Sequence, residues 1–224
     1  MTTVGFIGSG NIGSTVARLA TAAGYDVIMS NSRGPDSLSD LVRELGPHAS
    51  AGTTADAALA DLVVVTIPLG NFRDIPAELL AGRIVIDTMN YYPQRDGAIP
   101  ELADGKMSSS ELVQTDLPEA QVVKAFNNIF FRHLGELARP AGSPDRSALP
   151  ISSDTPDAKS QVTEFLDRIG YDIVDIGPLA DSWRSQPDTP VYGAVYAADP
   201  ADWAAGPAPA GRDKVAVAVE AAKR

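Results

Sequence analysis

The sequence predicts an α/β protein of the Rossmann type, built on a doubly wound and mostly parallel sheet. Short apolar runs alternate with helical patterns from residue 3 to residue 176, which is typical of parallel strands joined by helices. A glycine-rich turn joins the first apolar run to the first helical pattern. We expect this fold over residues 1–180, followed by a short proline-rich C-terminal extension over residues 181–224.

The first element is a strand, a turn and a helix over residues 3–23. Its spacing G-x-G-x-x-G fits the dinucleotide-binding fingerprint. Gly8 allows a tight turn, Gly10 lets the backbone approach a pyrophosphate, and Gly13 lets the helix pack closely on the strand. The free N–H groups and the positive end of the helix dipole then favour phosphates. An ordinary glycine-rich turn is the alternative interpretation.

The second strand, predicted over residues 25–29, ends where such folds select their cofactor. An NAD enzyme is expected to place a carboxylate there, to accept hydrogen bonds from the ribose 2′-hydroxyl. This chain has Ser30, Asn31, Ser32 and Arg33 instead, so no carboxylate repels a 2′-phosphate and a guanidinium can bind it. The segment favours NADP over NAD. A polar turn with a solvated arginine is the alternative.

The later elements follow from apolar runs and helical spacing. Residues 62–68 form a continuous β-branched run, which is typical of a central parallel strand covered on both faces. Residues 157–169 have the apolar spacing of an amphipathic helix, which Gly170 ends. Further strands are expected at residues 49–53, 83–87, 121–127, 149–154 and 171–176. Further helices are expected at residues 37–45, 54–60, 75–80, 109–117, 128–137 and 213–224.

The loop after residues 62–68 lies at the edge where open α/β sheets bind their ligands. We expect Ile67, Pro68 and Leu69, where the run passes into this loop, to form the wall near the nicotinamide end of the cofactor. An ordinary loop between a strand and a helix is the alternative.

The loop at residues 88–97 also follows a predicted strand, and it concentrates hydrogen-bonding and aromatic side chains. Asn90, Tyr92 and Arg95 are therefore candidates for contacting a cofactor or a substrate.

Composition excludes several classes of function. The 18 Lys and Arg residues against 29 Asp and Glu residues give a net charge of −11, which argues against a nucleic-acid or anionic-membrane surface. Cysteine is absent, so disulfides, thiolate metal sites and a cysteine nucleophile are excluded, and two histidines make a histidine-rich metal site unexpected. Neither a leader pattern nor a run of about 18 apolar residues is present. We expect a cytoplasmic protein without a metal site.

The chain resembles the family of coenzyme F420-dependent NADP oxidoreductases. The resemblance covers residues 3–180 and rests on five motifs: GFIGSGNIG, SNSR, TIPL, VVKAFN and DIGPL, which begin at residues 5, 30, 66, 122 and 175. It implies an enzyme that binds NADP(H) and exchanges a hydride with coenzyme F420. The segments at residues 90–97 and 182–193 depart from the family pattern, and both fall where the second substrate is expected.

The resemblance also implies a set of cofactor-binding residues. The pyrophosphate would lie along Gly8, Ser9, Gly10, Asn11 and Ile12. The 2′-phosphate would lie by Ser30, Ser32 and Arg33, and the nicotinamide would be bordered by Ile67, Pro68, Leu69, Ala125, Phe126 and Asn127.

The chemistry would be direct hydride transfer, in which the protein positions two rings and excludes water. Lys124, Asn127, His133 and Tyr92 are the candidates for polarising a carbonyl or orienting a ring, although a lone histidine such as His133 is more often structural. Two other hypotheses stay open: an NADPH-dependent reductase of a small carbonyl, imine or flavin, and a protein that binds NADP without turnover. By analogy with related small reductases we expect a homodimer whose partner molecule is a small redox acceptor, with the extension completing the acceptor pocket or a subunit contact.

Overall fold

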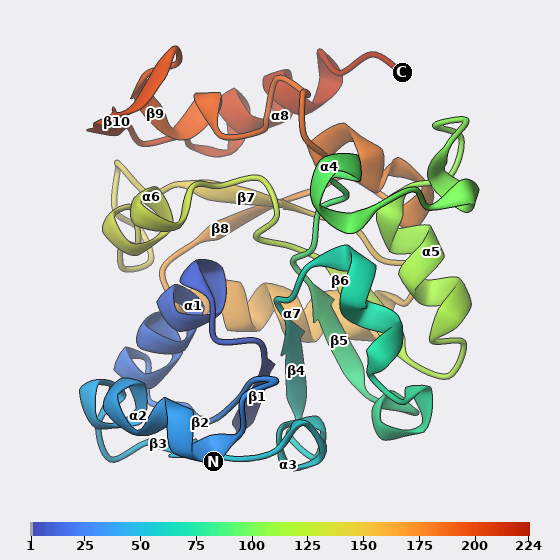
Figure 1. Ribbon diagram of the computed structural model, residues 1–224. Helices are drawn as coiled ribbons and strands as arrows, with labels where there is room; N and C mark the ends of the chain where they lie inside the picture. The colour runs from blue at the N-terminus through green and yellow to red at the C-terminus, as the bar shows by residue number, and fades with distance from the viewer. Residues whose placement is uncertain (1) are drawn as a thin grey trace.

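The computed structural model describes residues 2–224, and its main feature is a six-stranded parallel sheet (Figure 1). The strands lie in the order β3-β2-β1-β4-β5-β6. They are β1 (Thr3–Ile7), β2 (Asp26–Ser30), β3 (Ala49–Ala51), β4 (Leu62–Val65), β5 (Ile84–Asp87) and β6 (Gln121–Lys124). This is the strand order of the Rossmann fold, so the predicted fold class is confirmed. The order reverses between β1 and β4, and ligands bind at such a switch point.

The connections between strands are α-helices and short 3-10 helices. The α-helices are α1 (Asn11–Ala22), α2 (Ser39–Leu45), α3 (Thr54–Ala58), α4 (Pro93–Asp96), α5 (Ser109–Asp116), α6 (Phe131–Glu136), α7 (Pro156–Arg168) and α8 (Arg212–Glu220). The 3-10 helices are η1 (Pro35–Leu38), η2 (Leu69–Asp74), η3 (Ala77–Leu80), η4 (Pro100–Leu102), η5 (Leu179–Ser185) and η6 (Ala194–Tyr196). Among the described residues, none of these helices is long and apolar enough to cross a membrane.

The sheet is buried on both faces. Neighbouring residues of a strand point to opposite faces, so each strand contributes to two cores. In β4, Val64 belongs to a core shared with α1 and α7, whereas Val63 and Val65 belong to a second core shared with α3 and α5. The predicted central strand, covered on both faces, is confirmed, but β4 ends at Val65 rather than at residue 68.

Two predicted helices depart most from the structure, whereas those predicted at residues 37–45 and 213–224 differ at an end, since α2 begins at Ser39 and α8 ends at Glu220. The short helix predicted at residues 75–80 is the 3-10 helix η3 at residues 77–80, because Ile75, which precedes a proline, has an extended backbone. The helix predicted at residues 128–137 begins only at Phe131. The reason is that Phe126 has a φ of 63°, so the chain leaves β6 in an irregular turn before α6 can start.

The last two predicted strands do not extend the central parallel sheet. β7 (Ala148–Ile151) and β8 (Asp172–Asp175) pair in parallel with each other around α7. Their link to the central sheet is one antiparallel bridge, between Lys124 and Ser152. The alternation of strand and helix predicted the elements correctly, but it does not distinguish a strand that adds to a sheet from one that starts another.

The C-terminal extension contains a hairpin that the sequence did not reveal. β9 (Ala197–Asp199) and β10 (Asp202–Pro207) are antiparallel, and α8 follows them. Figure 1 shows these elements, in orange to red, across one end of the molecule beside β7 and β8. Buried side chains of this segment belong to the same core as the central sheet: Val191, Val195, Tyr196, Ala210, Val215 and Val219.

Candidate nucleotide-binding and active site

Two neighbouring cavities lie at the carboxyl ends of the parallel strands. The β2 cavity, of about 500 Å³, is lined by the glycine turn, by the loop after β2 and by residues 66–76. The β5–β6 cavity, of about 330 Å³, is lined by the start of α1, by the loops after β5 and β6 and by the C-terminal segment. The cavities share Gly10, Thr66, Ile67 and Pro68, so they meet at the switch point.

The glycine turn is fixed by backbone packing between β1, α1 and β4. Gly8 has a φ of 117°, and a Cβ on it would clash with the backbone of Thr66. A Cβ on Gly13 would lie 2.6 Å from the carbonyl oxygen of Gly8. Gly10 differs from both, because nothing lies within 4 Å of a Cβ built there. Two glycines therefore serve the packing of the turn, and the third leaves open space for a ligand.

The N-terminus of α1 faces this open space. Its N-cap is Gly10 and no side chain caps its first turn, so the N–H groups of Asn11, Ile12 and Gly13 are free to bind an anion. Asn11 and Ile12 also line the β5–β6 cavity, so α1 begins where the two cavities meet.

The loop after β2 divides into a buried part and an exposed part. The Ser30 hydroxyl is fully buried and donates to the Phe6 carbonyl at 2.8 Å, so it is not available to a ligand. The Asn31 side chain shapes the loop, because it donates to Ser9 Oγ at 3.1 Å and accepts from the Arg33 N–H at 2.9 Å.

Ser32 and Arg33 are exposed and line the β2 cavity together with Asn31. The Arg33 guanidinium makes neither an ion pair nor a hydrogen bond within residues 2–224. Asp74 also contributes a carboxylate to the lining of this cavity.

The loop after β4 places only part of its predicted wall at the cavities. Ile67 and Pro68 line both cavities, whereas Leu69 is fully buried in the core beside α3 and α5 and lines neither. The loop turns into the 3-10 helix η2 at Leu69, which points that side chain inward.

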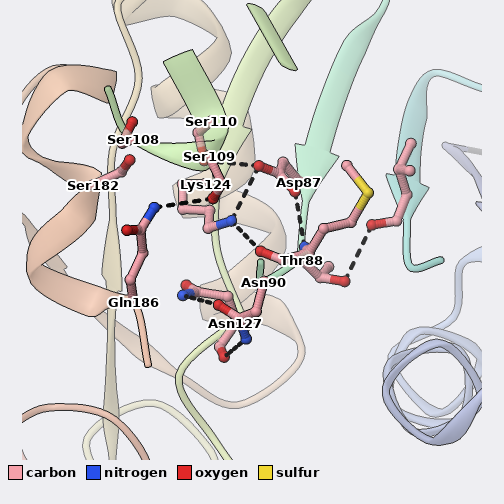
Figure 2. A network of polar contacts seen from close by, with 12 residues as sticks. Asp87, Thr88, Asn90, Ser108, Ser109, Ser110, Lys124, Asn127, Ser182 and Gln186 are labelled. Carbon is pink, nitrogen blue, oxygen red and sulfur yellow. Dashed lines mark hydrogen bonds and ion pairs between the residues drawn. The ribbon is translucent and has the colours of Figure 1, made fainter. Parts of the chain in front are cut away.

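An amide pair joins the loops after β5 and β6, as Figure 2 shows. Asn90 donates to the Asn127 carbonyl at 2.7 Å, and the Asn127 amide donates to Asn90 Oδ1 at 3.1 Å. Both residues line the β5–β6 cavity, as does Phe126, whereas Ala125 is buried and does not. The sequence-predicted candidates Asn90, Phe126 and Asn127 are thus brought together.

A buried ion pair supports this wall from behind. Lys124 Nζ lies 3.1 Å from Asp87 Oδ2 and also donates to the Met89 carbonyl (Figure 2). Asp87 accepts further hydrogen bonds from Ser110 at 2.7 Å and from the Met89 N–H at 2.8 Å. Burial lowers the pKa of Lys124, while the Asp87 carboxylate opposes this shift. Lys124 lies outside the cavity lining, so its contacts hold the loop after β5 rather than reach a substrate.

His133 likewise lies outside the cavity. It is 1% exposed, and its Nε2 is 2.9 Å from the Trp203 carbonyl, so Nε2 carries the proton in this hydrogen bond. The ring packs edge-on against Phe130. His133 therefore connects α6 to the hairpin strand β10, whose Trp203 does line the β5–β6 cavity.

Tyr92 is hydrogen-bonded to Tyr192, a residue that the sequence analysis did not single out. Its hydroxyl is hydrogen-bonded to the hydroxyl of Tyr192, from the C-terminal extension, and both rings line the β5–β6 cavity. The Arg95 guanidinium stacks on Tyr92, 4.9 Å from the ring centre, and also pairs with Asp96 at 2.8 Å. The only sequence signal for Tyr192 was its place in the segment at residues 182–193, which departs from the family pattern, and Trp203 lies beyond that segment.

Among residues 2–224, no three His, Asp or Glu side chains are grouped as metal ligands would be.

Comparisons with known proteins agree with this site. A model for the family "NADP oxidoreductase coenzyme F420-dependent" matches residues 3–91, which hold the glycine turn and the loops after β2 and β4. The crystal structure of the hypothetical protein SMa0349 from Sinorhizobium meliloti is 36% identical, with a TM-score of 0.75 over 85% of this chain and 93% of that one.

Two further relatives are informative. A protein from Arthrobacter sp. FB24, whose name assigns it to the F420-dependent NADP reductases, is 28% identical with a TM-score of 0.67 over 81% of this chain and 87% of that one. The Escherichia coli K12 protein YjhV is 40% identical over 53 residues, which are 24% of this chain. The chain spans only 39% of the length of that curated relative.

The fold, the site and these relatives support an NAD(P)-dependent oxidoreductase. Residues 3–91 belong to the coenzyme F420-dependent NADP oxidoreductase family.

The open space at Gly10 leads to a first prediction. In Gly10→Ala, the added methyl group enters the open space in front of α1 and prevents the pyrophosphate from approaching the backbone closely. We therefore expect NADPH to bind at least about tenfold more weakly, which corresponds to a loss of about 1.4 kcal/mol in binding free energy. The melting temperature should change little, because Gly10 has a φ of −72° that alanine adopts easily. NADPH fluorescence titration and thermal unfolding measure the two effects.

Gly211→Ala is the matched control. Gly211 is also a helix N-cap, with a φ of −67° and no atom closer than 3.8 Å to an added Cβ, but it lies outside both cavities. Equal NADPH affinities of the two variants would contradict a nucleotide site at Gly10.

The buried ion pair leads to a second prediction. Lys124→Met leaves Asp87 buried without its charged partner, so we expect a loss of about 3–5 kcal/mol in the free energy of unfolding. Lys106→Met removes an ion pair whose lysine is 85% exposed, and it should cost less than about 1 kcal/mol. Urea unfolding followed by circular dichroism measures both, and similar costs would show that the Asp87–Lys124 pair does not stabilise the fold.

Proposed function

We propose that this protein transfers a hydride between NADP(H) and coenzyme F420. The observation that carries the cofactor half is the β2 cavity, which holds the unpaired Arg33 guanidinium and the exposed Ser32 side chain and which reaches Gly10, the N-cap at the uncapped start of α1. Its volume of about 500 Å³ lies within the range of pockets that bind small molecules and cofactors.

The residues fit NADP more closely than NAD. Arg33 is free to bind a 2′-phosphate bidentately, and Ser32 adds a hydroxyl beside it. No carboxylate occupies residues 30–33, where an NAD enzyme would hold the ribose. The N–H groups at the start of α1 would hold the pyrophosphate.

The β5–β6 cavity would hold the reacting rings. The loops that line it supply aromatic side chains and the Asn90–Asn127 amide pair, and it opens onto the start of α1 through Gly10. NADPH, when bound, supplies the hydride that coenzyme F420 accepts. The chain's own contribution is to position both molecules and to exclude water, for which the aromatic side chains that line the cavity are suited.

The choice of acceptor is supported by the family and by the name of the Arthrobacter relative. A second candidate is the reduction of a small carbonyl or imine by NADPH. It is favoured by the phenol hydroxyls of Tyr92 and Tyr192, because such a reaction needs a proton donor in the cavity.

The test is a steady-state assay with oxidised coenzyme F420 and either NADPH or NADH, following both absorbance bands. We expect bleaching of F420 with NADPH and much slower bleaching with NADH. Arg33→Ala should raise the KM for NADPH by about 10- to 100-fold, the cost of a charge-assisted hydrogen bond, and should change the KM for NADH little.

Arg43→Ala is the control, because Arg43 is an exposed arginine of α2 that pairs with Asp40 and lines neither cavity. Binding of NADPH without any bleaching of F420 would exclude F420 as the acceptor and leave the carbonyl or imine reductase. Equal use of NADH and NADPH would contradict the role of Arg33.

A further inference from the structure

Tyr92 and Tyr192 lie 100 residues apart in the sequence, and their hydroxyl groups meet in the wall of the β5–β6 cavity. Tyr92 comes from the loop after β5, and Tyr192 comes from the C-terminal extension. Both side chains are only partly buried, so the pair is accessible from the cavity.

The two phenol hydroxyls have two hydrogen atoms to donate, and only one of them is used in a hydrogen bond of the structure. Each hydroxyl carries one hydrogen, and either phenol can donate to the other. Their mutual hydrogen bond consumes one hydrogen only. No other hydrogen bond of either hydroxyl occurs within the described part of the chain, so one O–H remains free to donate to a ligand.

The surroundings hold both rings in place. The Arg95 guanidinium stacks on the Tyr92 ring, and the ring centres of Trp203 and Tyr192 are 5.9 Å apart. Gly193 makes this second contact possible, because a Cβ at that position would overlap the Trp203 ring. A phenol is protonated at neutral pH at its ordinary pKa, and burial raises the pKa of Tyr192 further, so this hydroxyl remains a donor.

We propose that the Tyr92–Tyr192 hydroxyl pair binds and orients the electron acceptor, by donating its free hydrogen to a carbonyl oxygen or a ring nitrogen of that molecule. The inference rests on the proposed function, since it assumes that an oxidised ring enters the β5–β6 cavity. The pair acts through a hydrogen bond, and no covalent bond is made or broken at either tyrosine. A preformed pair fixes the donor before the acceptor arrives, which reduces the ordering needed on binding.

This arrangement predicts an unusual pattern of substitutions. When one phenol is replaced by phenylalanine, the other loses its partner but keeps its own O–H, which it can donate to the acceptor. Tyr92→Phe and Tyr192→Phe alone should therefore weaken binding of oxidised F420 by no more than about threefold. The double variant has no donor, and its binding should weaken by about tenfold, the upper range for one neutral hydrogen bond.

The experiment titrates oxidised F420 into each protein without NADPH and follows the deazaflavin fluorescence and absorption. Hydrogen bonding to a ring oxygen or nitrogen alters the absorption band, so the bound band should shift in the double variant relative to the wild type. In turnover, the KM for F420 should rise more than kcat falls. NADPH affinity should stay unchanged in Tyr92→Phe, Tyr192→Phe and the double variant, and all three should still fold.

Tyr91→Phe is the matched control from the same loop. The Tyr91 hydroxyl donates to the Gly97 carbonyl at 3.0 Å and accepts from the Ile99 N–H at 3.1 Å, and it does not line the cavity. This variant should lose stability and keep its affinity for F420.

The outcomes separate the two proposals. If wild-type protein neither binds nor reduces F420, the proposed acceptor and this inference both fail. If the wild type binds F420 and the double variant binds it equally with the same absorption band, only the inference fails. Loss of NADPH affinity or of folding in the double variant would show that the pair is structural, which also overturns the inference.

Discussion

The structure depends most on the close backbone contact between β1, α1 and β4 at the glycine turn. Gly8 and Gly13 have no room for a Cβ, because the Thr66 backbone and the Gly8 carbonyl occupy that space. This contact places the start of α1 directly at the point where the strand order reverses. The two cavities meet there, at Gly10 and at Thr66–Pro68, so a single extended molecule can contact both.

A second layer of contacts shapes the cavity beyond β5 and β6. The Asp87–Lys124 pair and its hydrogen bonds to Met89 hold the loop that carries Asn90 and Tyr92. The C-terminal segment adds Tyr192 and Trp203 to the lining of this cavity, and His133, in α6, is hydrogen-bonded to the Trp203 carbonyl. Burying a lysine is costly unless it is paired, and here the pair stabilises a wall of the site.

The sequence predicted the residues that line the β2 cavity better than the contacts around the β5–β6 cavity. The fingerprint and the loop at residues 30–33 are local motifs, so their positions follow from nearby residues, although spacing alone could not show that Ser30 donates inward to Phe6. The burial of Leu69 depends on a 3-10 turn that periodicity does not signal. Pairing between Tyr92 and Tyr192, or between His133 and β10, arises from long-range folding and has no local pattern. The expected homodimer remains a prediction.

The most direct test of the central claim is a crystal structure of the protein with NADP⁺ bound. The account predicts the pyrophosphate at the N–H groups of Asn11 and Ile12 and the 2′-phosphate against the Arg33 guanidinium, with the nicotinamide beyond Ile67 and Pro68 in the β5–β6 cavity. A 2′-phosphate far from Arg33, or a nicotinamide outside that cavity, would contradict it.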